Sequence, residues 1–324
     1  MDILTLILGI AFAVYGAQLL VDGGVAIATR FGIPTLVIGS TVVAFGTSMP
    51  EFTVNIQSAL AGKTDLALGN ILGSNLFNIA AIIGIVALIT PLAVSDDSRR
   101  KDFPMCLIGA VMIGVAGNQL YLDGIKYHEL MLSDGLTFLL FFWIFMRYIY
   151  AEAAAGASDH HHASKKAKPE DGSGGLSMGR AGLYIALGLV GLVFGGEFIV
   201  DGATGIARSF GLSERVIGLA IVGPGTSVPE LVASIVAALK KQVDMVIGNV
   251  LGSNILNVFF TLGATALIAP VPLDLSLNTV VLINIGITAA LAAYVRFSNR
   301  SIGRPVGLLL IVAYVAYLVT AIMA

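Results

Sequence analysis

The sequence predicts an all-α membrane protein of ten transmembrane helices, built as two inverted five-helix repeats with broken helices at the midplane. Three observations lead to this prediction. The chain of 324 residues is 57% hydrophobic and only 12% charged, whereas soluble domains are about 25% charged. Apolar runs long enough to cross a bilayer as helices recur along it. In addition, the second half of the chain repeats the first.

The apolar runs, which are bounded by charged residues or proline, define the ten helices. Those of the first half are expected at 3–29, 33–61, 65–90, 103–122 and 130–149, and those of the second at 182–207, 212–239, 244–269, 278–297 and 303–323. Residues 151–179 lack an apolar period and are rich in small and charged residues, which is typical of an exposed, flexible connector. We therefore expect a first repeat over 1–150, a flexible connector over 151–179 and a second repeat over 180–324.

The repeat aligns residue n with residue n+179 without a gap. From Gly16 to Pro91 the alignment gives 33 identities in 76 positions, and many of the identical residues are polar. Because each half has an odd number of helices, the second half must enter the membrane from the opposite side. This inverted arrangement is the one from which many secondary transporters are built.

The basic residues predict the orientation of the chain. If the N-terminus lies outside, 14 of the 18 lysines and arginines fall on inner loops and helix ends, and 4 fall on outer ones. The positive-inside rule then favours two outer termini and a cytoplasmic connector over 151–179. We expect a multi-pass protein of the cell (inner) membrane.

A polar stretch interrupts the second helix of each repeat, Gly46–Glu51 in the first and Gly225–Glu230 in the second. Pro50 has no N–H and its ring crowds the carbonyl of Gly46, so the helix should break or kink there, and likewise at Pro229. Backbone groups freed at membrane depth are tolerated only where they are buried or line a polar cavity. A carboxylate within a span is by default a sign of function.

The third helices supply a matching polar stripe with a spacing of four residues. Its members are Asn70, Ser74 and Asn78 in the first repeat and Asn249, Ser253 and Asn257 in the second. Proline kinks and polar residues at helix interfaces often serve packing alone, but their joint occurrence in both repeats favours an oxygen-rich ion site. Ca²⁺ takes six to eight oxygen ligands. The lack of His and Cys near these stretches argues against zinc, copper or iron.

The paired Gly-Thr-Ser-x-Pro-Glu and Gly-Asn-x-x-Gly-Ser-Asn motifs resemble the α-repeats of the cation/Ca²⁺ exchanger superfamily, in particular its Na⁺/Ca²⁺ exchanger branch of prokaryotic type. The resemblance covers nearly the whole chain. It implies a secondary active transporter, not an enzyme, that exchanges Na⁺ for Ca²⁺ across the bilayer by alternating access. We expect a monomer without cofactor or nucleic-acid partner, with K⁺ as a further candidate ion.

The resemblance also implies a set of ion ligands by motif position. They are the backbone carbonyl of Ala44 with Thr47, Ser48, Glu51, Ser74 and Asn78, and the backbone carbonyl of Gly223 with Thr226, Ser227, Glu230, Ser253 and Asn257.

Two departures from the family pattern bear on coupling. Many Na⁺/Ca²⁺ exchangers have an aspartate at one of the positions of Asn78 and Asn257, and here both are amides. The site therefore has one negative charge fewer, which leaves the Na⁺ stoichiometry and any K⁺ dependence open. Val222-Gly223-Pro224 stands where the first repeat has Val43-Ala44-Phe45 and where the family usually has an Ala-Phe-like pair. We expect Pro224 to perturb the seventh helix one turn before the site.

Three other functions fit the sequence less well. A Ca²⁺/H⁺ antiporter of the same superfamily is the nearest alternative, but those exchangers carry Gly-Asn-x-x-Glu in place of Gly-Thr-Ser-x-Pro-Glu. A passive cation channel would more naturally use symmetric rings of charge or carbonyl groups around a pore. An intramembrane protease would need a paired aspartate motif or a nucleophile, and the sequence shows neither.

Overall fold

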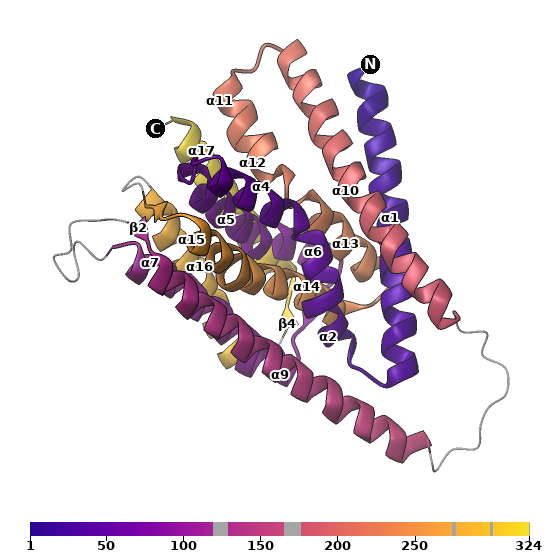
Figure 1. Cartoon of the computed structure of the whole chain (residues 1–324). Helices are drawn as coiled ribbons and strands as arrows, with labels where there is room; N and C mark the ends of the chain where they lie inside the picture. The colour runs from indigo at the N-terminus through magenta and orange to yellow at the C-terminus, as the bar shows by residue number, and fades with distance from the viewer. Residues whose placement is uncertain (119–128, 165–175, 274–276, 299–300, 324) are drawn as a thin grey trace.

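The computed structural model describes residues 1–118, 129–164, 176–273, 277–298 and 301–323, and these are predominantly helical (Figure 1). Seven helices in this part of the chain are long and apolar enough to cross a membrane. They are Asp2–Phe31, Ala67–Ile89, Leu132–Gly156, Met178–Ser209, Val243–Ile268, Asn278–Phe297 and Arg304–Met323. The prediction of a helical membrane protein is confirmed.

The first half begins with the long helix α1 (Asp2–Phe31). An interrupted helix follows, made of α2 (Thr35–Ile38), the π-helical segment η1 (Gly39–Val43), α3 (Ala44–Thr47) and α4 (Met49–Leu60). The next helix is continuous and made of α5 (Asp65–Leu76), η2 (Phe77–Ile82) and α6 (Ile83–Ile89). The half ends with η3 (Ser98–Asp102), α7 (Phe103–Ala116) and α9 (Leu132–Ser164).

The second half has the same order of elements. The long helix α10 (Met178–Ser209) precedes an interrupted helix made of α11 (Glu214–Ile217), η4 (Gly218–Val222), α12 (Gly223–Gly225) and α13 (Val228–Leu239). The following continuous helix consists of α14 (Val243–Ile255), η5 (Leu256–Leu262) and α15 (Gly263–Ile268). The last two helices are α16 (Asn278–Phe297) and α17 (Arg304–Met323).

The π-helical segments recur in the register of the repeat. Segment η1 shifted by 179 residues coincides with η4, and η2 shifted in the same way begins where η5 begins. Segments η1 and η4 precede the interruption in the second helix, and η2 and η5 contain the last residue of the polar stripe in the third, Asn78 or Asn257. π-helical turns are rare and are often found at functional sites. Their occurrence at matching positions of both halves therefore indicates a functional region next to the polar residues.

Two short antiparallel ribbons join the halves. Strand β1 (Leu92–Ala93) pairs with β4 (Ser301–Ile302), and β3 (Val271–Pro272) pairs with β2 (Glu129–Leu130). Each ribbon links the end of the third helix of one half to the start of the last helix of the other half. The two halves are therefore tied to each other by equivalent contacts.

The third helix of each half forms the centre of the fold. Within Ala67–Ile89 and Val243–Ile268, 83% and 94% of the span is buried, against 17–28% in the other apolar spans. A helix that is apolar around most of its circumference needs this burial. The polar stripes of these two helices are therefore shielded from lipid.

Helices α1 and α10 lie side by side along most of their length (Figure 1). Glycines make this close approach possible, because a Cβ added at Gly16 would lie 2.7 Å from the carbonyl oxygen of Gly188. Gly195, the counterpart of Gly16, would likewise bring a Cβ to 2.5 Å from the backbone nitrogen of Ala13. Small residues at helix interfaces allow such backbone contact in membranes.

The fifth helix differs from its expected bounds. It was expected to end at 149, but α9 continues to Ser164 and so includes part of the expected flexible connector. The Ala-rich stretch that begins at Ala151 consists largely of strong helix formers, which explains the extension. Residues 165–175 of the connector lie outside the described residues. The fourth helix ends at Ala116 instead of 122, and 119–128 are likewise outside them.

Candidate ion-binding site

Both polar stretches interrupt their helices, as predicted from their prolines. In the first repeat α3 ends at Thr47 and α4 begins at Met49, with Ser48 between them at φ −83° and ψ 6°. The break lies two residues before Pro50, which occupies the first turn of α4, where its missing N–H leaves no helical bond unmet. The proline therefore begins the second helical piece instead of ending the first.

The predicted ligand side chains gather at these interruptions and on the adjacent third helices. Glu51 and Glu230 have no exposed surface at all. Thr226 is half-buried, and the other predicted ligand side chains are buried, namely Thr47, Ser48, Ser74, Asn78, Ser227, Ser253 and Asn257. The structure thus brings together side chains from the two halves of the sequence in one solvent-shielded region.

The two carboxylates are held crosswise by the two repeats. The Ser227 hydroxyl donates to Oε1 of Glu51 at 2.8 Å, and the Ser48 hydroxyl donates to Oε1 of Glu230 at 2.9 Å. Ser253 also lies 3.4 Å from the same oxygen of Glu230. A hydrogen bond to a carboxylate is stronger than one between neutral groups, so the bonds from Ser227 and Ser48 orient each carboxylate from the partner repeat.

The threonines of the motifs also contact the opposite repeat. Thr47 donates to Oδ1 of Asn249 at 3.2 Å, and Thr226 lies 3.5 Å from Oδ1 of Asn70. Ser74 lies 3.4 Å from the hydroxyl of Thr226. The hydroxyls are therefore part of a network across the repeat interface.

A second layer of polar residues was missed at the sequence level. The amide of Asn70 donates to Oδ1 of Asn55 at 2.9 Å, and the amide of Asn249 donates to the hydroxyl of Ser234 at 3.0 Å. Asn55 and Ser234 are related by the 179-residue shift. Both are fully buried. The sequence contains a signal for this pair, because a polar residue occurs at the same position of two otherwise apolar helices.

Four asparagines form hydrogen bonds between the two third helices. Asn78 donates to Oδ1 of Asn254 at 3.0 Å, and Asn257 donates to Oδ1 of Asn75 at 3.1 Å. The amides of Asn75 and Asn254 donate to each other's backbone carbonyls at 3.4 and 3.1 Å. With their NH₂ groups used in this way, the Oδ1 atoms of Asn78 and Asn257 are fixed in orientation.

Four buried oxygens in this region have no hydrogen-bond partner. They are Oε2 of Glu51, Oε2 of Glu230, Oδ1 of Asn78 and Oδ1 of Asn257, which form two pairs related by the repeat. An unsatisfied buried acceptor is costly. All four are oxygen acceptors, the atoms that hard cations bind.

The carboxylates would have to be supplemented by neutral oxygens to bind a cation. Among the described residues, no group of three or more His, Cys, Asp or Glu side chains is arranged to hold a metal ion. Two carboxylates with hydroxyl and amide oxygens suit Ca²⁺ or Na⁺ better than a transition metal.

The two predicted carbonyl ligands have different surroundings. The carbonyl of Ala44 accepts from the Ser48 N–H at 3.0 Å and from the Thr47 hydroxyl at 3.4 Å. In the second repeat the Ser227 N–H donates to the carbonyl of Pro224 at 3.0 Å, not to that of Gly223. The helical piece that contains Pro224 is also one residue shorter than α3, so the halves differ here, one turn before the site.

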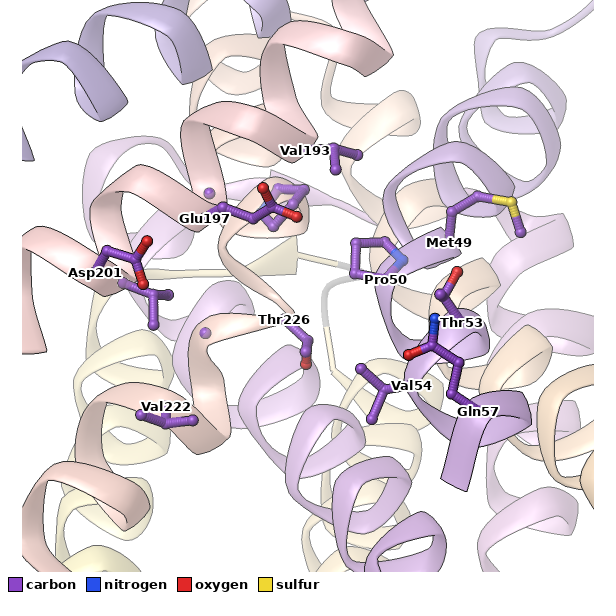
Figure 2. Close-up of a pocket in the computed structure, with 14 residues that line it drawn as sticks. Met49, Pro50, Thr53, Val54, Gln57, Val193, Glu197, Asp201, Val222 and Thr226 are labelled. Carbon is purple, nitrogen blue, oxygen red and sulfur yellow. The ribbon is translucent and has the colours of Figure 1, made fainter. Parts of the chain in front are cut away.

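A cavity of about 600 Å³ leads from the surface towards the interruption in the second repeat. It lies between α4, α10 and the start of α13, and its wall includes Thr226 and Pro229. Figure 2 shows Glu197 and Asp201 on α10, with Thr53 and Gln57 of α4 across from them. Glu51 and Glu230, each one residue beyond a proline of the cavity wall, are themselves excluded from solvent.

Comparison with known proteins gives a consistent result. The model of the family described as "sodium/calcium exchanger protein" matches residues 1–151 and 181–323. The chain is 37% identical to the inner membrane protein YrbG of Escherichia coli, over 97% of this chain and 94% of that protein. It is 32% identical to the putative antiporter CaxA of Alkalimonas amylolytica, over 96% and 95%. A solved structure of the sodium-calcium exchanger NCX_Mj superposes with a TM-score of 0.81 at 27% identity, covering 98% of each chain.

Proposed function

Because this chain belongs to the sodium/calcium exchanger protein family, a family of cation-exchange transporters, we propose that it exchanges Na⁺ for Ca²⁺ across the membrane by alternating access. We further propose that its helical pieces form ten spans in two inverted repeats, 1–150 and 180–324. The ion ligands are those expected from the motifs, with Glu51 and Glu230 at their centre.

One observation carries the proposal more than any other. The unpartnered oxygens of Glu51, Glu230, Asn78 and Asn257 occur as two repeat-related pairs in the buried centre of the fold. Two ionised carboxylates carry a charge of −2, which one Ca²⁺ or two Na⁺ would neutralise. Ions of both kinds would then compete for the same charge, and such competition is what an exchanger requires.

The crossed contacts support alternating access. Since each carboxylate is oriented by a serine of the other repeat, a movement of one repeat against the other changes both carboxylates together. We also propose a monomer that needs no cofactor, because a single chain supplies both halves of the site. We propose that both termini lie outside, that 151–179 is cytoplasmic, and that the protein resides in the cell (inner) membrane.

The alternatives differ in what drives Ca²⁺ movement. A Ca²⁺/H⁺ antiporter is supported by the likeness to a putative antiporter, but the Gly-Thr-Ser-x-Pro-Glu motif in both repeats favours Na⁺. A passive channel would need an open path, whereas Glu51 and Glu230 are fully shielded.

The test is ⁴⁵Ca²⁺ uptake into proteoliposomes that contain the purified protein. Uptake should require Na⁺ inside and stop when the Na⁺ gradient is removed, at constant pH. Uptake driven by a pH gradient without Na⁺ would identify the Ca²⁺/H⁺ antiporter instead. Uptake that needs neither gradient would indicate a channel. Repeating the assay with K⁺ on either side determines whether K⁺ is a coupling ion.

A further inference from the structure

The two halves differ in charge in the turn that follows α4 and α13, where Ala61-Gly62-Lys63 of the first half corresponds to Lys240-Lys241-Gln242 of the second. Lys240 directly follows α13, and its Nζ donates to Oδ1 of Asp22 at 2.6 Å and to the backbone carbonyl of Gln18 at 3.3 Å, both on α1. The counterpart of Lys240 in the first half is Ala61, which directly follows α4. Alanine cannot form an ion pair, so the corresponding tie between α4 and α10 does not exist.

The backbone of this turn is the same in both halves. Gly62 has φ 68°, and its counterpart Lys241 has φ 61°. A lysine adopts this left-handed conformation only at a cost, whereas glycine adopts it freely. Because the turns match in conformation, the difference between the halves at Lys240 and Ala61 is one of side-chain charge.

Equivalent acidic positions on α1 and α10 also differ in their surroundings. Glu197 and Asp201 on α10 are the counterparts of Gln18 and Asp22 on α1. Asp22 is paired with Lys240, whereas neither Glu197 nor Asp201 has a hydrogen-bond or ion-pair partner among the described residues, and both line the cavity in Figure 2.

The two interfaces also differ in how closely their helices pack. Helix α1 packs against α13. The cavity separates the equivalent pair, α10 and α4. The interface that contains Lys240, between α1 and α13, is closed, and the equivalent interface next to Ala61, between α10 and α4, is open.

We propose that Lys240 is a positioning residue for the exchange reaction: by holding α1 against α13, it shifts the equilibrium towards the state in which the ion site is reached from the α10–α4 cavity. This inference rests on the alternating access proposed above. In the opposite state, α10 would close on α4 and α1 would separate from α13, which requires the Lys240–Asp22 pair to break.

The exposure of the pair limits its strength. The Lys240 and Asp22 side chains are 31% and 49% exposed, and exposed ion pairs change an equilibrium by about 1.4- to 5-fold. Lys240 therefore biases the two states without locking one of them. A bias of this size is compatible with turnover, because the pair must break in every transport cycle.

The test compares two equivalent cysteine positions in a Cys106→Ala background. Thr53→Cys places a thiol on the cavity wall. Val232→Cys places one at the matching position of α13, next to the closed α1–α13 interface. Each is combined with Lys240→Ala, Lys240→Arg and Ala61→Lys. The rate of labelling by a membrane-impermeant thiol reagent is measured from each side of sealed vesicles, without a transport assay.

Val232 is half-buried in this state and becomes fully accessible only when α1 separates from α13, so the labelling rate of Val232→Cys rises with the population of that other state. Lys240→Ala should raise this rate about 1.4- to 5-fold, Lys240→Arg should leave it at the starting value, and Ala61→Lys, which introduces a lysine opposite Asp201, should raise it. An unchanged rate with Lys240→Ala, or an equal rise with Lys240→Arg, would overturn the proposal. The labelling assay measures accessibility and needs no transport, so a failure of Na⁺-driven Ca²⁺ uptake would leave this result standing by itself.

Discussion

The Ser48 hydroxyl of one repeat donates to Glu230 of the other at 2.9 Å, and Ser227 makes the equivalent bond to Glu51 at 2.8 Å. Each carboxylate thus lies on one half and is oriented by the other. A site built in this way exists only where the two halves meet, and it responds to any movement between them.

The two carboxylates should both be essential for Ca²⁺ exchange. Glu51→Gln or Glu230→Gln keeps the shape of the side chain but removes half of the negative charge that balances a divalent ion. Na⁺-driven ⁴⁵Ca²⁺ uptake should fall to background in either variant, while the yield of folded protein is retained. Glu152→Gln, which changes a half-buried carboxyl of α9, is the control and should keep its uptake. Full activity of either site variant would exclude a two-carboxylate site.

The amides should determine the coupling ions. Asn257 uses its NH₂ group on Asn75, and its Oδ1 is buried without a partner. In Asn257→Asp, an ionised carboxylate would attract cations in a region of low effective dielectric, although burial also favours its protonated form. We expect Asn257→Asp to change the dependence of exchange on Na⁺, K⁺ or pH more than it changes expression.

That prediction is checked by titrating Na⁺, K⁺ and pH for the wild type and Asn257→Asp in parallel. If all three profiles superimpose, Asn257 lies outside the ion path. Asn78→Asp is the matched variant of the first repeat, and it should change the same profiles.

The contact between α1 and α10 should not tolerate a methyl group. In Gly16→Ala the new Cβ would lie 2.7 Å from the carbonyl oxygen of Gly188 and 2.8 Å from the backbone nitrogen of Leu192, so one helix must move. Overpacking of this kind typically costs about 1–3 kcal/mol. Gly182→Ala is the control, since its Cβ meets no atom within 4 Å. A thermal unfolding midpoint that is equal in both variants would contradict the close contact.

Stability should depend on pH through Asp102, which lies at the end of η3. Burial raises the pKa of Asp102 to about 6, against the opposing hydrogen bonds from Ser98 and Tyr148. Because the folded-state pKa is above the ordinary value near 3.9, the folded protein binds this proton more tightly. The free energy of unfolding should therefore fall as the pH rises from about 4 to 6, by up to about 3 kcal/mol.

Asp102→Asn cannot ionise and should remove this loss, so that the variant is more stable than the wild type at pH 7.5. Thermal unfolding measured between pH 4 and 8 checks this. Asp97→Asn is the control, because Asp97 is half exposed and pairs with Lys101 only at the surface. Parallel pH profiles for the wild type and Asp102→Asn would show that Asp102 does not titrate as described.

The orientation is tested by a cysteine in the expected connector. Ser158→Cys in a Cys106→Ala background should react with an impermeant thiol reagent only from the cytoplasmic side. The reason is that basic residues are concentrated on the loops that this orientation places inside. Labelling of intact cells from outside would reverse the orientation.

The sequence alone predicts much of this fold because the repeat keeps polar residues in register. Apolar runs mark the helices, and the paired Pro50 and Pro229 predict the interruptions that the structure contains. The predicted end of the fifth helix is less accurate. The small residues after Tyr150 are typical of a linker, but alanine is also the strongest helix former, so the helix continues.

Contacts between the repeats could not be predicted from spacing along one chain. Thr47 and Glu51 are four residues apart, which suggests a shared helix face, yet the helix is interrupted between them and Thr47 contacts Asn249 instead. The π-helical segments and the pairing of Asp22 with Lys240 likewise depend on how the halves pack. A linear pattern does not contain that packing.

The most direct measurement of the central claim is to locate Ca²⁺ in crystals of the protein by its anomalous scattering. An ion shared by the two repeats should give a peak between the Oε2 atoms of Glu51 and Glu230, with oxygens from both repeats at about 2.3–2.6 Å. The peak should disappear when Na⁺ replaces Ca²⁺ in the crystal. A Ca²⁺ peak elsewhere, with none between these two carboxylates, would contradict the shared site.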